Sequence, residues 1–223
     1  MKFIIFFLLL SIGTIGTAQE ISIDLDNFNK IEVTRGLKVN LTSAKENKAV
    51  IIGNSRDKVK VNVERGILKV SSGLNQLLET DNTLITIYFK DLQNVEARQN
   101  SRVEFCQKIT QPLLILKSRE GSDIFANIEI ENLVAGLATG GSITVIGKAD
   151  IQEIDVKAAG DFRGENLLGQ NVNIKLTGGG TANINAKNYV NAAVRAGGIV
   201  HIYGNPEELI ENITFGGTIK KIN

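Results

Sequence analysis

Basic side chains recur at one position of a repeating pattern, and their types and spacing suit binding chemistry. The repeat places an outward-facing residue three positions before each corner of the chain. In chain order these residues are Arg98, Arg119, Ala138, Lys157, Thr177, Arg195 and Thr214. Stacked repeats would align the four basic residues in a discontinuous cationic stripe, which we call the basic column. Such a stripe suits the carboxylate or sulfate groups of an acidic polysaccharide. We favour the alternative, a solvated charged face on which Glu96, Glu120 and Asp155 balance the basic residues.

Other residues that often take part in catalysis are few. His201 is the only histidine, and alternation puts it on the outer side of a strand, so we predict no histidine-based zinc site. Cys106 is the only cysteine, which excludes a disulfide within the chain. We interpret it as an ordinary strand or loop residue rather than a catalytic thiol.

Three carboxylates lie close together in the sequence, at Asp150, Glu153 and Asp155. They could hold calcium, but strand alternation separates Asp150 from the other two, and we interpret them as solvated. The chain has no serine nucleophile elbow, and its Gly178-Gly179-Gly180 run has no following lysine. The sequence therefore predicts no metal, no cofactor and no catalytic residues.

A repeat of about 20 residues with small-residue corners positions these side chains. The corners are Ser101, Ser122, Gly141, Gly160, Gly180, Gly198 and Gly217, which by subtraction lie 21, 19, 19, 20, 18 and 19 residues apart. Glycine permits the sharply bent backbone that such a corner needs. This period is typical of a β-solenoid, in which each repeat is one coil stacked on the last.

Apolar residues alternate on both sides of each corner. Around Gly141, for example, Ala135 and Leu137 precede the corner and Ile143 and Val145 follow it. Residues two apart in a strand share a face, so each repeat directs two short strands into one core. An antiparallel sandwich of regularly spaced hairpins is the alternative. The aligned corners favour an all-β fold of the β-solenoid class, right-handed and parallel β-helix-like, with coils of about 20 residues.

The N-terminal subregion, residues 19–90, follows this template once, around Gly36. Residues 50–89 then alternate in short runs that predict a β-meander. No proline- or serine-rich linker separates this subregion from the seven coils of residues 91–223. We therefore expect residues 19–223 to form a single domain.

Residues 1–18 have the features of a cleaved secretory signal peptide. Lys2 supplies the positive start, residues 3–12 the apolar run and residues 16–18 a small-residue cleavage site. No stretch is long enough to span a bilayer as a helix. The sequence predicts export to the periplasm, the outer-membrane surface or the extracellular space.

The charge balance argues against nucleic acid as a partner. Removal of Lys2 from the 25 basic residues leaves 24 against 24 acidic ones, so the mature chain has a formal net charge of zero. A nucleic-acid-binding domain usually carries a basic excess on one face.

Taken together, these features resemble the putative auto-transporter adhesin family with a head GIN domain. The similarity is carried by residues 28–33 (FNKIEV), residues 66–70 (GILKV), the small-residue corners, residues 203–206 (YGNP) and residues 216–221 (GGTIKK). Several serine corners of the family are Gly-Gly here. The resemblance implies an exported β-helix-like fold. It implies adhesion through the family's name alone and supplies no catalytic residues.

Three functions fit these observations. The first, which we prefer, is a non-enzymatic cell-envelope protein, an adhesin or binding module whose partner is a glycan or a surface protein. The second is an enzyme that acts on acidic polysaccharide through the basic column. The third is a periplasmic structural or signalling module that binds another protein. The flat sides of a solenoid are also compatible with a homo-oligomer.

Overall fold

Strands build nearly all of the described chain, residues 20–73 and 83–222 of a computed structural model. The predicted signal peptide, residues 1–18, lies outside these ranges. The helical content of the described residues is one 3-10 turn, η1, at Arg56–Lys58. The strands are β1 Glu20–Asp24, β2 Lys30–Val33, β3 Lys38–Ser43, β4 Lys48–Ile52, β5 Val59–Glu64, β6 Ile67–Ser72, β7 Leu84–Phe89, β8 Asn94–Ala97, β9 Arg102–Phe105, β10 Ile109–Arg119, β11 Asp123–Ala138, β12 Ser142–Lys157, β13 Asp161–Thr177, β14 Thr181–Arg195, β15 Ile199–Tyr203, β16 Glu208–Thr214 and β17 Thr218–Lys221.

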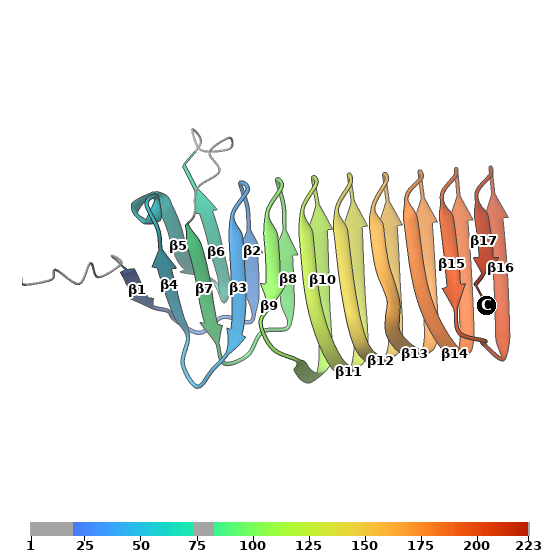
Figure 1. Cartoon of the computed structure of the whole chain (residues 1–223), viewed down its shortest axis with the longest axis horizontal. Coiled ribbons are helices and arrows are strands. Elements are labelled where there is room, and N and C mark those ends of the chain that lie inside the picture. The colour runs from blue at the N-terminus through green and yellow to red at the C-terminus, as the bar shows by residue number, and fades with distance from the viewer. Residues whose placement is uncertain (1–19, 74–82, 223) are drawn as a thin grey trace, which may run out of the picture.

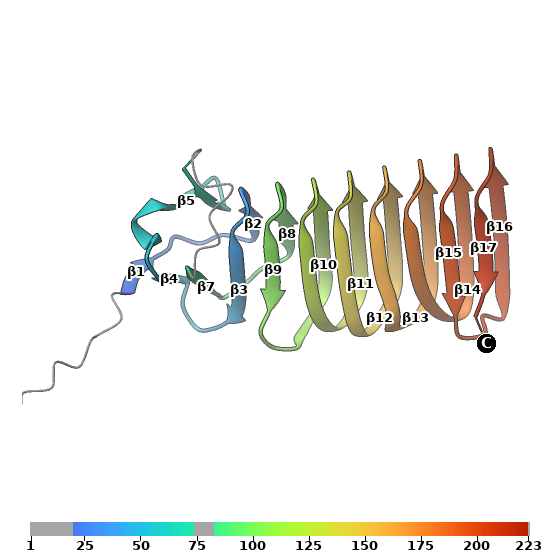
Figure 2. The same cartoon turned by 45° about the horizontal axis from the view of Figure 1, so that its top comes forward.

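The coils stack along the long axis of the molecule, with their corners aligned along one edge (Figure 1). Residues before each corner form one parallel sheet, which we call face 1: β6, β2, β8, the C-terminal halves of β10 to β14, and β16. Residues after each corner form face 2: β7, β3, β9, the N-terminal halves of β11 to β14, β15 and β17. Each of β11 to β14 runs along face 2, bends, and returns along face 1 as part of the next coil (Figure 2).

The strand register confirms the predicted β-solenoid, with about 7 turns of about 19 residues each. On face 2, Ile124 pairs with Val103 before it and with Ile143 after it, and Ile143 pairs with Phe162. These offsets equal the predicted corner spacings.

The core is the narrow space between the two faces. The predicted inward residues Val103, Ile124, Ile143 and Phe162 of face 2 are all at most 1% exposed. On face 1, Ala135 and its neighbours in the column, Leu116 and Ile154, are at most 3% exposed. Burying one such large apolar side chain contributes about 1.5–3 kcal/mol, so stability accumulates coil by coil.

Each corner is a tight turn whose two central residues have left-handed backbone conformation. Thr139 and Gly140 have φ of 51° and 72°, and Ala158 and Ala159 have φ of 46° and 62°. A backbone hydrogen bond closes the turn between its first and fourth residues. In the third corner, for example, the Gly141 N–H donates to the Ala138 carbonyl at 3.0 Å. Positive φ at both central residues is the type I′ geometry.

The bend therefore lies at the two residues before each predicted corner position. Glycine is needed at the predicted corner positions for a different reason, which is that neighbouring coils approach each other closely there. A Cβ on Gly141 would lie 2.1 Å from the Ser118 carbonyl oxygen, and one on Gly160 would lie 2.9 Å from the Leu137 Cβ. The later corners have a third residue of positive φ as well, at Gly180, Gly198 and Gly217.

The N-terminal end is more elaborate than a meander. The antiparallel pairs β5–β6 and β4–β7 are present, and β1 adds to β4. In addition, β6 pairs in parallel with β2, and β7 pairs in parallel with β3. Thus β6 and β7 supply a further pair of coil strands on the N-terminal side of the β2–β3 coil, which itself lies next to β8 and β9.

The corner geometry predicts that Ala159→Gly stabilises the protein. A left-handed alanine is disfavoured by Cβ sterics, and glycine removes this penalty while adding some entropy to the unfolded chain. Ala159 is exposed, so its methyl group contributes little packing. We expect the free energy of unfolding to rise by about 1 kcal/mol, measured by urea denaturation. An unchanged or lower value would contradict the turn assignment.

The opposite result is expected for Gly141→Ala. Its Cβ would overlap the Ser118 carbonyl oxygen, which belongs to the backbone and cannot rotate away. We expect a loss of about 3 kcal/mol in unfolding free energy, measured by the same method. Gly136→Ala is the matched control, because the nearest atom to its Cβ would be the Lys117 Cγ at 3.7 Å. Equal losses in the two variants would argue against close approach as the cause.

Candidate functional site

The outer side of face 1 carries the predicted basic column. Its residues occupy successive positions on neighbouring strands: Arg119 pairs with Ala138, Lys157 with Thr177, and Thr177 with Arg195, which in turn pairs with Thr214. Arg98 comes directly after Ala97, the last residue of β8 that pairs with β10. The residues chosen from the sequence therefore lie along one line.

Each basic residue of this column has a partner within the protein. The Arg98 Nη2 lies 3.0 Å from the Glu120 Oε1, and the Lys157 Nζ lies 2.6 Å from the Asp155 Oδ2. Arg119 forms a longer ion pair, in which its Nη1 lies 3.8 Å from the Glu96 Oε1. Arg195 places its guanidinium 5.9 Å from the centre of the Phe215 ring, within the range of a cation–π contact. Three of the four basic residues of the column are thus ion-paired, and the fourth lies against an aromatic ring.

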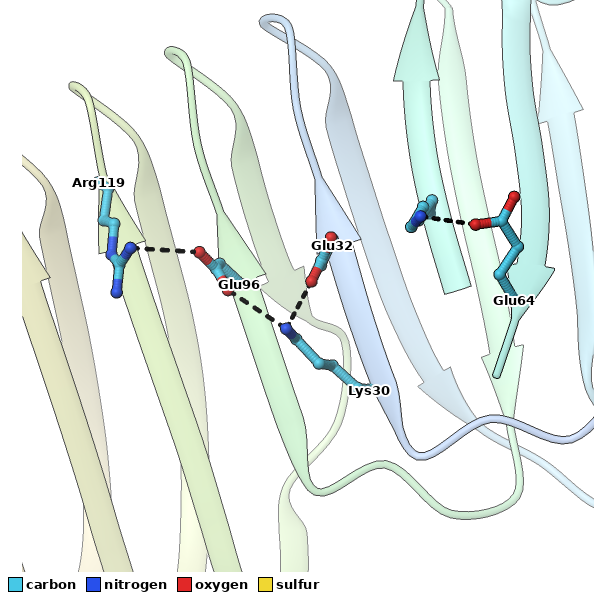
Figure 3. A network of polar contacts seen from close by, with 6 residues as sticks. Lys30, Glu32, Glu64, Glu96 and Arg119 are labelled. Carbon is cyan, nitrogen blue, oxygen red and sulfur yellow. Dashed lines mark hydrogen bonds and ion pairs between the residues drawn. The ribbon is translucent and has the colours of Figure 1, made fainter. Parts of the chain in front are cut away.

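Glu96 is the centre of the most buried part of this network. Figure 3 shows it between Lys30 of β2 and Arg119 of β10, so that three neighbouring strands are linked. The Lys30 Nζ lies 3.5 Å from the Glu96 Oε2 and also donates to Glu32. The side chain of Glu96 is 10% exposed, so solvent screens these pairs less than it screens the surrounding ones.

The hydrogen bond to Glu32 raises the pKa of Lys30 above its ordinary value of 10.5, against an opposing effect of burial. The negative charges of Glu32 and Glu96 act in the same direction as the hydrogen bond. Lys30 therefore stays charged across the physiological range and stabilises the fold there.

Next to this network, face 1 has a hollow of about 660 Å³. Its lining extends from β10 across β11, β12 and β13 to β14, and the outward side chains are short at Gly136 and Ala138 of β11 and at Ala193 of β14. Longer side chains also border it, among them Arg119 and Lys157 of the basic column. The size of the hollow is in the range of a small-ligand site.

Two lysines that the sequence did not single out border this hollow, Lys117 and Lys175. They belong to the adjacent outward column, in which Lys117 pairs with Gly136, Gly136 with Asp155, and Asp155 with Lys175. Within residues 20–73 and 83–222, neither lysine makes an ion pair or a side-chain hydrogen bond. The repeat could have found them, because they stand five residues before their corners.

The remaining candidates are dispersed. His201, on the outer side of face 2, has its Nδ1 3.0 Å from the Asn183 Oδ1, and Cys106 is an exposed free thiol. Asp150 pairs with Lys148, and Glu153 accepts a hydrogen bond from Asn173. Among the described residues, no three histidine, cysteine or acidic side chains are grouped closely enough to hold a metal ion. That part of the chain also has no helix able to cross a membrane.

Comparison with known proteins gives a family match. The model of the family described as "Putative auto-transporter adhesin, head GIN domain" matches residues 27–206, and this confirms the resemblance found in the sequence. A search of curated proteins found no match.

Solved structures show the same fold. A "putative adhesin" from Bacteroides fragilis has a TM-score of 0.82 at 22% identity, with 92% of this chain and 98% of that chain covered. A "putative lipid binding protein" from Parabacteroides distasonis has a TM-score of 0.72 at 17% identity, with 93% and 98% covered. A "putative adhesin" from Parabacteroides merdae has a TM-score of 0.65 at 16% identity, with 93% and 97% covered.

The Glu96 network predicts a pH-dependent effect of Lys30→Met. The pKa of Lys30 is raised in the folded protein, so its contribution is complete below pH 10.5 and is lost as the pH rises through the folded-state pKa. We expect the variant to lose about 1 kcal/mol at neutral pH and to approach the wild type in strongly alkaline buffer, measured by urea unfolding.

Lys38→Met is the control for general effects of lysine removal. Lys38 lies exposed on face 2 and forms no ion pair within the described chain. A loss for Lys30→Met that stayed constant with pH, or that matched the control, would contradict the role of the network.

Proposed function

Since the chain belongs to the family of auto-transporter adhesins with a head GIN domain, we propose that it is an exported, non-enzymatic binding module of the cell envelope. The module presents one face of a rigid solenoid to its partner. The match to residues 27–206 supports this proposal because it covers all coils but the last.

The observation that carries the proposal is the construction of face 1. Its backbone is held by parallel pairing from β6 to β16, and many of its long outer side chains are fixed by ion pairs. Such a surface loses little conformational freedom when a partner binds, which favours affinity. The hollow around Gly136 interrupts this surface and gives it a concave shape that a partner can recognise.

An enzyme that uses the basic column is less well supported. Its catalytic residues would have to be Arg98, Arg119, Lys157 or Arg195, and each of these already contacts an acidic or aromatic neighbour. A cation held in this way contributes to surface order and is less available to a reacting group.

Export is the other part of the proposal. The predicted signal peptide at residues 1–18 supports it, as does the adhesin description of the family. Of the three compartments that the sequence left open, the cell surface agrees best with adhesion.

A protease test on intact producing cells checks this placement. With a tag after Asn223, we expect external protease to remove the tag while a periplasmic marker protein stays intact. The purified mature chain should also coat beads and make them adhere to cells or matrix. Protection of the tag until the outer membrane is opened would contradict surface adhesion and favour the periplasmic module.

A further inference from the structure

We infer that the hollow over Gly136 on face 1 binds an acidic oligosaccharide, whose anionic groups contact Lys117 and Lys175. The inference rests on the proposed function as a binding module and assigns the ligand class and its site. The residues involved differ from the basic column predicted from the sequence.

Short side chains on β11 contribute to the shape of the hollow, whose lining runs from β10 to β14 along the solenoid axis. Along the outer side of β11 the side chains are Val134, Gly136 and Ala138, while β10 and β12 carry long charged residues at the same level. No bulky side chain covers Gly136, because a Cβ there would make one ordinary van der Waals contact, at 3.7 Å from the Lys117 Cγ. The result is a shallow trough with an aliphatic floor, on which the apolar side of a sugar ring can lie.

The charge of the hollow favours an anion. Of its bordering carboxylates, Asp155 is neutralised by Lys157 and Glu120 by Arg98. Lys117 and Lys175 have no such partner within the described ranges. Their unpaired ammonium groups leave two positive charges that a ligand can satisfy.

The spacing of the two lysines indicates an oligosaccharide rather than a monosaccharide. They stand in one column, separated by Gly136 and Asp155, which is three strand intervals or about 14 Å. A chain of sugars lying along the solenoid axis would reach both lysines. A single sugar ring would reach only one of them.

Polar groups suited to sugar hydroxyls complete the site. Glu153, Asn173 and Asn191 lie in the next outward column on three consecutive strands. Asn173 donates to Glu153 at 2.8 Å, and the amide of Asn191 makes no side-chain hydrogen bond within the described chain. Among the carboxylates that border the hollow, Glu153 is the one that forms no ion pair. It would accept hydrogen bonds from sugar hydroxyl groups, and its negative charge would weaken the binding of an anion.

The test is calorimetric binding of an oligogalacturonate to the purified mature chain, with the neutral oligogalactose and the galacturonate monomer for comparison. We expect the acidic oligomer to bind more tightly than either, and its affinity to fall with salt. Lys117→Gln and Lys175→Gln should each weaken binding about tenfold, whereas Glu153→Gln should strengthen it severalfold. Gly136→Val should weaken binding by a factor similar to that of the lysine variants, because its side chain would project from the floor of the hollow between the two lysines.

Controls separate binding from folding. Gly136→Val puts a β-branched residue on a strand, where its Cβ would make an ordinary contact 3.7 Å from the Lys117 Cγ, so its thermal stability should be no lower than that of the wild type. Lys38→Gln removes an exposed lysine from face 2 and should leave affinity unchanged.

Three results would overturn the inference. Binding that is unchanged in Gly136→Val would place the glycan elsewhere on the solenoid and leave the binding-module proposal intact. Capture of phosphatidylglycerol vesicles but not of oligogalacturonate, lost in both lysine variants, would replace the glycan with an anionic lipid headgroup. Adhesion of coated beads without any oligogalacturonate binding would reject this ligand while the proposed function stands.

Discussion

The left-handed turn at each corner is the constraint on which the rest of the structure depends. It reverses the chain within two residues, and its backbone is hydrogen-bonded to the turn of the next coil, as when the Gly140 N–H donates to the Ala158 carbonyl at 3.1 Å. The parallel ladder therefore continues around the corner from face 1 to face 2. Since coils locked in this way cannot slide, every side chain has a fixed column, which faces either the core or solvent.

This fixed register divides the sequence into two independent parts. The inward columns must be apolar and of suitable size, because they fill a core only one layer thick. The outward columns are free to vary, and on face 1 they carry both the Glu96 network and the hollow beside it. Stability and recognition are thus assigned to alternate residues of the same strands. A change from Gly136 to a larger residue alters the surface without reaching the core.

Much of the fold could be predicted because it depends on local alternation. The period, the inward columns and the coil around Gly36 all follow from residues two apart and from the small residues between them. The parallel insertion of β6 and β7 beside β2 and β3 could not be predicted, because alternation does not identify the partner of a strand. The left-handed Ala158 and Ala159 were also missed, since alanine does not indicate a turn. The candidate site was harder still. The sequence found the basic residues and also the acidic residues Glu96, Glu120 and Asp155, which pair with three of them. It gave no sign that Lys117 and Lys175 lack such partners.

The two ends of the solenoid explain why binding should use a face. At the N-terminal end, the antiparallel strands β1, β4 and β5 cover the parallel sheets and replace coil strands with a different pairing. At the C-terminal end, Glu211 and Lys221 occupy inward positions of the last coil, where charge opposes the stacking of another chain. Ile213 and Phe215 are exposed there at 48% and 80%, and the Phe215 ring lies 5.9 Å from the Arg195 guanidinium. With both edges protected in this way, the long ion-paired side of the coils remains as the surface on which a partner can be held without extending the sheet.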